Sequence, residues 1–312
     1  MMKHAYLIMA HANFQQLAFL ISLLDDPRND IFVHIDAKAN FTEEDKHMLE
    51  DASKQSNLLL TDRKAIYWGG FSQVKAEFLL FERAKLYGRY HFYHLLSGSD
   101  LPIVHQDRIH QFFDEHSQSI FLNRMTLEGD PENINRLKYY HFFEAFTPRT
   151  IPGVFGKGLF KLYRFLEVSI QKIMGVNLLK KYHLKPMKAS QWASLPEDVV
   201  LSLLEHKEWV FKTFGKTFIP DEVFLPLFLN KFGFDNDVFD NTIKQNIPDE
   251  YQANLRFVNW WDGNPYVWTN SKEDKRQLQR LADKGYFFTR KFDLSEEDEL
   301  FDFILRLTKK RN

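Results

Sequence analysis

The sequence predicts an α/β protein with a largely parallel central sheet flanked by helices. Strand-like and helix-like segments alternate through residues 1–125, the pattern of a parallel sheet covered by helices. The chain has 312 residues, of which 44% are apolar, enough for a large core. After a basic middle segment, the last third returns to mixed helix and strand. No Ser/Gly-rich linker interrupts the chain, so we expect one large domain.

The first two strands enclose an amphipathic helix. Ala5–Ala10 is an apolar strand, and Asn13 with Gln16 is a capping pair for the helix that follows. Apolar residues recur at helical spacing on one face of it: Leu17, Leu20, Ile21 and Leu24. The helix ends before Pro27, and Ile31–Asp36 is the second strand.

The later elements continue the alternation. A helix begins at Ser72, and the strand His91–Leu96 enters the turn Ser97–Pro102. A helix through Ile109 and Phe113 then leads to a strand at Ser119–Asn123. In the last third we expect helices at Pro196–Glu205, Asp221–Lys231 and Asp298–Leu307, and a strand at Leu255–Asn259.

Charge and composition exclude several classes of protein. Forty-one basic and 42 acidic side chains give a net charge of −1, which argues against a protein that coats nucleic acid. The absence of cysteine excludes disulfides and thiolate metal sites. His91 and His94 face opposite sides of a strand, and His34 with Asp36 gives too few ligands for zinc, so a metal hydrolase is disfavoured. We expect no metal site.

The ends of the chain and its hydropathy bear on location. No window reaches 18 uncharged apolar residues, and Met1–Tyr6 lacks a signal-peptide core. We therefore expect neither a membrane span nor secretion, and a cytoplasmic, bacterial protein that can also lie at the inner face of the cell membrane.

A basic segment follows the first half. Residues 149–188 hold a single acid, Glu167, and nine basic residues: Arg149, Lys157, Lys161, Arg164, Lys172, Lys180, Lys181, Lys185 and Lys188. Residues 157–188 also carry apolar side chains at helical spacing, which suits a helix lying on an anionic membrane. The alternative, which we favour, is a solvated helix packed on the core by its Phe and Leu residues.

Polar residues at strand ends locate a cleft. Ligands of open parallel sheets bind outside the carboxyl ends of the strands. Asp36, Ser97–Asp100 and Asn123-Arg124 all fall at such ends, so we expect them to converge.

Three clusters of motifs carry a resemblance to a known family. They are IYWGGFSQVKA (66–76) with YHLLSGSDLP (93–102), ASQW (189–192) with PDE (220–222), and RFVNW (256–260) with TRKFD (289–293). In order and spacing the chain resembles the Core-2/I-branching β-1,6-N-acetylglucosaminyltransferases, whose relatives include peptide O-xylosyltransferases. The resemblance implies a GT-A-type nucleotide-sugar fold, a UDP-sugar donor, inversion at the anomeric carbon, and no obligatory divalent metal or other cofactor.

The resemblance also implies roles for the parts of the chain. Residues 1–125 would be the nucleotide-binding half, 126–188 a basic insertion or lid, and 189–312 the acceptor- and diphosphate-binding half. Glu222 matches the family's catalytic base, which removes the proton of the acceptor hydroxyl. As a plain sequence feature it is equally a residue of a helix N-terminus, where the backbone dipole favours a negative charge.

Charge on the leaving diphosphate needs a metal or fixed cations. The stretch where related folds carry Asp-x-Asp reads Gly98-Ser99-Asp100, and the literal Asp235-Asn236-Asp237 is expected to be a solvated loop. Arg256 and Lys291 align with the family's diphosphate-binding cations, with Arg290 as a rival for Lys291 and plain surface charge as the alternative.

The remaining site residues carry alternatives. By resemblance, Asp36 and Tyr67 line the uracil side of the cleft, although Asp36 can simply end its strand. Asp100 holds either a sugar hydroxyl or the turn at Ser97. Trp68, which precedes two glycines in a turn, is also expected to contact substrate, as are Gln191 and Trp192, although Trp192 can equally be a core residue. Arg136, Lys138 and Glu128 are expected near the acceptor, in a stretch that aligns poorly with the family.

The expected reaction moves a sugar, GlcNAc first, from UDP to the hydroxyl of a saccharide or lipid-linked saccharide. UDP-xylose and UDP-galactose forms are alternative donors. The alternatives from other classes are a carbohydrate-binding protein without turnover and a nucleotide-sugar hydrolase.

Overall fold

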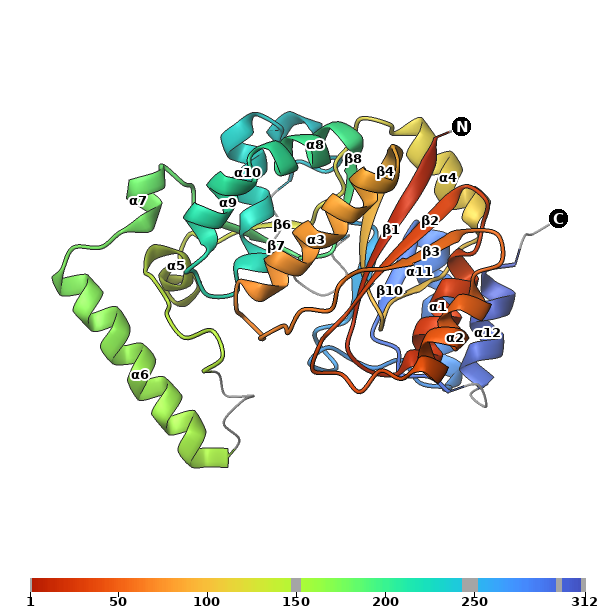
Figure 1. The fold of residues 1–312 in the computed structure, drawn as a ribbon, viewed down its shortest axis with the longest axis horizontal. Coiled ribbons are helices and arrows are strands. Elements are labelled where there is room, and N and C mark those ends of the chain that lie inside the picture. The colour runs from red at the N-terminus through yellow and green to blue at the C-terminus, as the bar shows by residue number, and fades with distance from the viewer. Residues whose placement is uncertain (1, 147–152, 243–251, 296–298, 310–312) are drawn as a thin grey trace.

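The computed structural model describes residues 2–146, 153–242, 252–295 and 299–309. A five-stranded sheet of order β3-β2-β1-β4-β8 forms its centre (Figure 1). Its strands are β1 Lys3–Ala10, β2 Asn29–Ile35, β3 Asn57–Leu60, β4 Tyr90–Ser97 and β8 Ser194–Pro196. The first four are parallel, and β8 pairs antiparallel with β4. The predicted class, a largely parallel sheet flanked by helices, is confirmed.

Helices cover both faces of the sheet (Figure 1). Because side chains alternate along a strand, Tyr6 and Ile8 of β1 join one core and Leu7 and Met9 join the other. The first core is completed by α1 Phe14–Leu24, α4 Gln106–Glu115, α11 Lys272–Lys284 and α12 Glu299–Leu307, with α2 Glu43–Ala52 outside α1. The second is completed by α3 Ser72–Tyr87, α8 Glu197–Glu205, α9 Lys207–Phe214 and α10 Phe224–Phe232.

Two smaller sheets lie beside the main one. One has the order β5-β10-β9, formed by Leu101–Pro102, Phe288–Arg290 and Arg256–Val258. The other pairs β6 Arg124–Thr126 with β7 Met187–Ala189. Between β6 and β7 lie α5 Pro131–Lys138, α6 Gly153–Ile173 and α7 Leu178–Tyr182. Figure 1 shows α6 set apart from the sheet and its covering helices.

The division of the chain into three functional parts stays a prediction, and Arg149 and Asp298 lie outside the described residues. None of the described helices has both the length and the apolar character that crossing a membrane requires.

The predicted start of α1 is confirmed in its main point. The Asn13 side chain accepts a hydrogen bond from the Gln16 N–H at 3.1 Å. The Gln16 side chain does not return to the cap, however. Its amide donates to the Gly98 carbonyl (2.9 Å) and accepts from the Leu294 N–H (2.8 Å), so one buried side chain joins α1, the end of β4 and the C-terminal segment.

One predicted element is wrong, and another begins later than expected. The strand at Ser119–Asn123 is absent because its neighbouring residues pair with different segments, Ile120 with Val238 and Phe121 with Ser194, so no ladder extends. The helix expected at Asp221–Lys231 is a 3₁₀ turn, Pro220–Glu222, followed by α10. Pro226 explains the break, since a proline fits the first turn of an α-helix but not its interior.

Candidate functional site

The carboxyl ends of β1, β2 and β4 lie at one edge of the sheet. In the strand register Ala10 lies opposite Ile35, and Met9 opposite Ser97. The Asp36 N–H donates to the Ala10 carbonyl and the Gly98 N–H to the Met9 carbonyl, both at 2.9 Å. The structure therefore brings Asp36 and the Ser97–Asp100 turn to the same edge, as expected.

Arg124 behaves differently from the expectation. It is buried, and its guanidinium lies 2.6 Å from Asp235. The Asp235-Asn236-Asp237 stretch is a short 3₁₀ helix in which Asn236 and Asp237 are exposed to solvent, as expected, and Asp235 also accepts a hydrogen bond from Asn230. Arg124 and Asp235 thus form a structural ion pair.

Asp36 and Tyr67 are brought together through Lys38, which the sequence reasoning missed. Asp36 accepts from the backbone N–H groups of Lys38 (2.9 Å) and Ile66 (3.3 Å), the residue before Tyr67. The Lys38 ammonium lies 3.6 Å from the other Asp36 oxygen and 4.6 Å from the centre of the Tyr67 ring. The available signal was spacing: Lys38 follows Asp36 by two residues beyond the strand end.

A second group of side chains surrounds Asp100. This carboxyl group is buried, accepts from the Ser97 N–H at 2.9 Å, and lies 3.3 Å from the Arg290 Nε. Burial raises its pKa, and the charge of Arg290 opposes that effect. The Arg290 guanidinium in turn lies 4.8 Å from the Trp192 ring centre, and Trp192 is half-buried. Of the two roles considered for Asp100, these contacts correspond to holding the turn.

Arg256 is not the open cation that was expected. It is 1% exposed, and its guanidinium donates to the carbonyls of Asn254 (2.7 Å) and Ala193 (3.0 Å) and to the Ser194 hydroxyl (3.0 Å). Burial lowers the pKa of Arg256 to about 10. Arg256 is the first residue of β9, and its side chain points inward. It therefore joins the loop before β9 to the segment that forms β8. Lys291 is half-buried at the end of β10, directly after Arg290.

Glu222 ends the 3₁₀ turn and precedes the start of α10 by two residues, so it does not lie inside the first turn of an α-helix as expected. Its side chain is 38% exposed, 4.0 Å from the Lys188 Nζ. This turn is joined to the Trp68-Gly69-Gly70 turn, since the Ile219 N–H donates to the Gly69 carbonyl at 2.8 Å. Gly69 has φ +73°, and a Cβ there would lie 2.8 Å from the Phe218 ring. Glycine is therefore required at this contact.

Two buried carboxyl groups lie behind Glu222. Asp221 accepts from the Gln73 amide at 3.3 Å, and Gln73 accepts from the Gly69 N–H at 3.0 Å. Burial, followed by the charge of Glu222, raises the pKa of Asp221 to about 8. Glu77 of α3 is fully buried, and burial followed by the charge of Asp221 raises its pKa well above the usual range.

The sequence reasoning missed this pair. The signal for Glu77 was present, because it falls on the face of α3 that carries Val74, Phe78 and Phe81. Gln191, expected at the wall of a sugar site, instead donates to Glu77 at 2.7 Å and lies 3.6 Å from the Met9 sulfur.

The residues of α5 reach the same neighbourhood through Phe218. The Phe218 N–H donates to the Arg136 carbonyl at 3.2 Å, and the Arg136 guanidinium lies 5.9 Å from the centre of the Phe218 ring. The Trp68 ring contacts the Phe218 ring edge-on. Lys138 lies instead over the Tyr139 ring, and Glu128 is exposed. Trp68 is 38% exposed.

A cavity of about 180 Å³ opens beside the glycine turn. Its lining includes Gly70, Phe142, Glu144, Arg164 and Phe218. Glu144 accepts from the Ser72 N–H at 3.1 Å, and a Cβ on Gly70 would lie 2.6 Å from the Glu144 carboxylate. The cavity therefore combines aromatic and charged walls next to the turn that carries Trp68.

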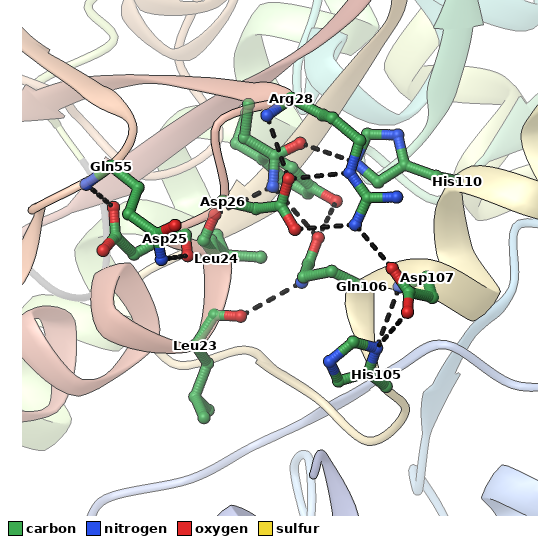
Figure 2. Close-up of polar contacts among 12 residues, drawn as sticks. Leu23, Leu24, Asp25, Asp26, Arg28, Gln55, His105, Gln106, Asp107 and His110 are labelled. Atoms are coloured by element: carbon green, nitrogen blue, oxygen red, sulfur yellow. Dashed lines mark hydrogen bonds and ion pairs between the residues drawn. The ribbon is translucent and has the colours of Figure 1, made fainter. Parts of the chain in front are cut away.

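The opposite edge of the sheet carries a polar network with a different character. Figure 2 shows Arg28 between Asp26 and Asp107, each 2.7–2.8 Å away. The His110 Nε2–H donates to the side-chain oxygen of Asn29, the first residue of β2, at 2.9 Å. Because its charges pair with one another at the amino ends of the strands, this network does not match a ligand site of a parallel sheet.

Metal ions in proteins are held by clusters of His, Cys, Asp and Glu side chains. Within residues 2–146, 153–242, 252–295 and 299–309, no cluster of three His, Cys, Asp or Glu side chains is arranged to hold a metal ion. His94 is buried between Ser194 (2.7 Å) and His4 (3.0 Å), and His91, which faces Asp114 of α4 at 3.2 Å, also contacts the His4 ring. The expectation that His91 and His94 face opposite sides of the strand is therefore wrong, because the pairing of β4 with β1 shifts register at His91 and the alternation of side chains is interrupted there.

Comparisons with known proteins give the family. The family model described as "Core-2/I-Branching enzyme" matches residues 4–280. No curated protein matches the sequence. Among solved structures, the chain is similar to core-mannan synthase A (CmsA/Ktr4) from Aspergillus fumigatus in its Mn/GDP form, with 11% identity over 80% of both chains and a TM-score of 0.35. It is also similar to apo mouse xyloside xylosyltransferase 1, with 10% identity over 73% of this chain and 83% of that chain, and a TM-score of 0.32. The match over most of its length shows that the chain belongs to the Core-2/I-branching enzyme family, and it is a glycosyltransferase that uses a nucleotide sugar.

Proposed function

We propose that the chain is an inverting, metal-independent glycosyltransferase that moves a sugar, GlcNAc first, from UDP to a saccharide hydroxyl in bacterial surface polysaccharide synthesis. The observation that carries the proposal is the position of Glu222. Its half-exposed carboxylate belongs to the turn that the Ile219 N–H joins to the Gly69 carbonyl, and Gly69 and Gly70 line a cavity with aromatic and charged walls.

In the proposed reaction, Glu222 takes the proton of the acceptor hydroxyl. The oxygen then attacks the anomeric carbon, and the bond from that carbon to the diphosphate breaks. The leaving diphosphate carries away the electron pair, so no covalent intermediate forms and the configuration inverts. The neighbouring Asp221 is buried with a raised pKa, which leaves Glu222 as the accessible proton acceptor of this turn.

The leaving diphosphate needs fixed positive charge. We assign this role to Lys291 and its neighbour Arg290. Arg290 is held at the carboxyl edge of β4 by Asp100 and Trp192, whereas the donors of Arg256 already bind backbone carbonyls. Arg256 then acts as a support for the strands that carry this pair.

The nucleoside end of the donor would lie at Asp36 and Tyr67. The Asp36 carboxylate can accept from the uracil N3–H, and the Tyr67 ring can stack on the base. The Lys38 ammonium lies over one face of that ring, so a base that stacks on this face would take its place.

For the acceptor, we propose the side of the site formed by Trp68, Arg136 and Lys138. The ring of Trp192 can contribute to the sugar site only through its exposed part, since Arg290 covers one face. The polar head of Gln191 is engaged with Glu77, so its proposed substrate contact requires that bond to open. The acceptor class is a saccharide, free or lipid-linked. Xylose and galactose or galactofuranose remain the alternative transferred sugars.

The test is transfer by Glu222→Gln, measured as UDP release with a panel of UDP-sugars and saccharide acceptors. We expect at least a roughly 10²-fold loss of transfer with UDP affinity retained, the usual scale for a removed general base. Glu273→Gln, an exposed carboxylate in the first turn of α11, is the matched control. Unchanged transfer in the Glu222 variant would remove it from the mechanism.

A carbohydrate-binding protein without turnover would bind the UDP-sugar in a calorimeter and release no UDP with any acceptor.

A further inference from the structure

The long helix α6 is attached to the body of the protein by its polar side. Glu167 is buried and lies within 2.6–2.9 Å of the Tyr163 hydroxyl, the Arg164 guanidinium and the His141 ring. One turn later, the buried Gln171 amide donates to the Tyr140 carbonyl and accepts from its N–H, both at 2.7 Å. The polar face of the helix is thus its inner face.

The apolar side of α6 faces outward. Six large apolar residues at intervals of three and four line one side, with exposed fractions between 44% and 87%: Leu159, Leu162, Phe165, Leu166, Ile170 and Ile173. We call these six residues the α6 stripe. The expectation that this helix packs on the core by its Phe and Leu residues is therefore wrong. Among the described Phe and Leu side chains of α6, Phe160 reaches inward, toward Phe146 and Phe218, whereas the Phe and Leu side chains of the α6 stripe are exposed.

Positive charge surrounds the α6 stripe. Residues 153–188 contain one acid, the buried Glu167, and eight basic residues: Lys157, Lys161, Arg164, Lys172, Lys180, Lys181, Lys185 and Lys188. Lys157, Lys161 and Lys172 of the helix itself are exposed, as are Lys180, Lys181 and Lys185 after it. The outer surface of this segment therefore combines a continuous apolar stripe with cations and no exposed carboxylate.

We infer that the α6 stripe docks on an anionic lipid membrane. A contiguous exposed apolar patch marks an interaction surface, and an amphipathic helix with Lys on its flanks lies in the headgroup region with its apolar face in the acyl boundary. Anionic headgroups supply the negative charge that these cations lack within the segment, and each basic residue near the membrane surface adds to the attraction. The inference is independent of the proposed catalytic function.

A second copy of the chain fits the same surface less well. Two α6 stripes placed face to face would bring two arrays of lysines together without a carboxylate between them, and like charges at an interface oppose association. A membrane is larger than any such patch and carries the opposite charge. The charge distribution therefore selects the lipid surface.

Docking would also fix where the cavity beside the glycine turn lies. Arg164 and His141, which hold Glu167, both line that cavity. A membrane against the outer side of α6 would thus lie one helix away from it, which places a lipid-linked saccharide within reach of the site.

The test is flotation of the full chain with vesicles, in the absence of any sugar nucleotide or acceptor. One set is phosphatidylcholine alone, and the other contains phosphatidylcholine and phosphatidylglycerol in equal amounts. We expect the protein to float with the anionic vesicles, and to be released by salt. The double variant Leu162→Glu/Phe165→Glu should bind at least about tenfold less, because both side chains lose their apolar contact with lipid.

The matched control is Leu86→Glu, at a leucine of α3 that is 79% exposed and lies outside the stripe. It should float as the wild type does. Lys161→Gln/Lys172→Gln should reduce binding to anionic vesicles. Circular dichroism of each variant should match the wild type, since all the changed side chains are on the surface.

Three results would overturn the inference: no flotation of the wild type with anionic vesicles, equal flotation of the stripe variant, or a dimer in light scattering that the stripe variant dissociates. Because the assay contains no substrate, none of these results bears on transfer activity.

Discussion

The Gln191 amide donates a 2.7 Å hydrogen bond to the fully buried carboxyl group of Glu77. This bond joins α3 to the segment between β7 and β8, behind the turn that carries Glu222. The other Glu77 oxygen is buried, as is one oxygen of the adjacent Asp221, and neither has a hydrogen-bond partner in the structure. The interior next to the proposed base is therefore polar and sensitive to substitution.

Glu77→Ala should lower the free energy of unfolding by about 2–4 kcal/mol. The substitution leaves a cavity and removes the acceptor of the buried Gln191 amide. Glu77→Gln keeps the shape and an acceptor for Gln191, and it removes a carboxyl group whose ionisation is disfavoured by burial, so it should cost less than about 1.5 kcal/mol. Urea unfolding of both variants measures the difference. Equal losses would show that the negative charge of Glu77 matters instead.

Asp221→Asn should change how stability depends on pH. The folded pKa of Asp221 is about 8 against a usual value of 3.8, so between these values the folded state holds a proton that the unfolded state lacks. The contribution of this group is therefore greatest below pH 3.8 and is lost as the pH rises toward about 8, by up to about 1.4 kcal/mol per pH unit. Asparagine cannot titrate, so the variant should gain stability relative to the wild type as the pH rises. Parallel curves for the two proteins would contradict the assignment.

His110 should produce the opposite dependence. Burial lowers its pKa to about 4 from the usual 6.5, so between these values the unfolded state holds the extra proton. Stability from this group is complete above pH 6.5 and is lost as the pH falls toward 4. His110→Gln should lose less stability than the wild type over that range in thermal melts from pH 7 to 4. An equal loss in both proteins would assign the acid sensitivity to another group.

Arg290 and Arg256 should separate in their effects. Arg290→Gln removes a cation at the proposed diphosphate site and should weaken UDP binding by about tenfold or more in calorimetry, with a small change in stability. Arg256→Gln removes buried, charge-assisted hydrogen bonds and should lower the free energy of unfolding by about 2–4 kcal/mol. Loss of UDP binding from a stably folded Arg256 variant would restore its direct role.

Transfer should persist in excess EDTA, because the proposed cations are side chains of the protein. The measurement is initial rate with and without chelator, followed by addition of Mn²⁺. Abolition by EDTA and recovery with Mn²⁺ would replace the proposal with a metal-assisted departure of the diphosphate.

The parts of the fold that could be predicted depend on local patterns. Apolar runs and the Asn13 cap define β1 and α1, and Asp36 and the Ser97 turn meet because the ends of neighbouring parallel strands must meet. The helix expected at Asp221–Lys231 is present from Phe224, and its predicted start at Asp221 broke a local rule that was available, since Pro226 fits the first turn of a helix but not its interior.

Within the site, the errors concern tertiary contacts. An arginine at the start of a short strand gives no sign in the sequence that its side chain is buried. The buried Arg256 guanidinium donates to the carbonyl of Asn254, which is near in the chain, and to that of Ala193, which is distant and cannot be located from the sequence. Its spacing places Lys38 near Asp36, but its position over the Tyr67 ring depends on the path of the loop after β3, which brings Tyr67 back to the end of β2. The outward stripe of α6 has an ordinary amphipathic pattern, and sequence alone does not say which face the body covers.

The Gly69 turn has a consequence for protein engineering. Its N–H is bound to Gln73 and its carbonyl to Ile219, so the segment that carries Trp68 and the segment that carries Glu222 share one set of hydrogen bonds. The two loops are separated by about 150 residues in the chain, yet they form a single exchangeable module. A chimaera that takes one loop from a relative with a different acceptor should work only when it takes the other loop with it.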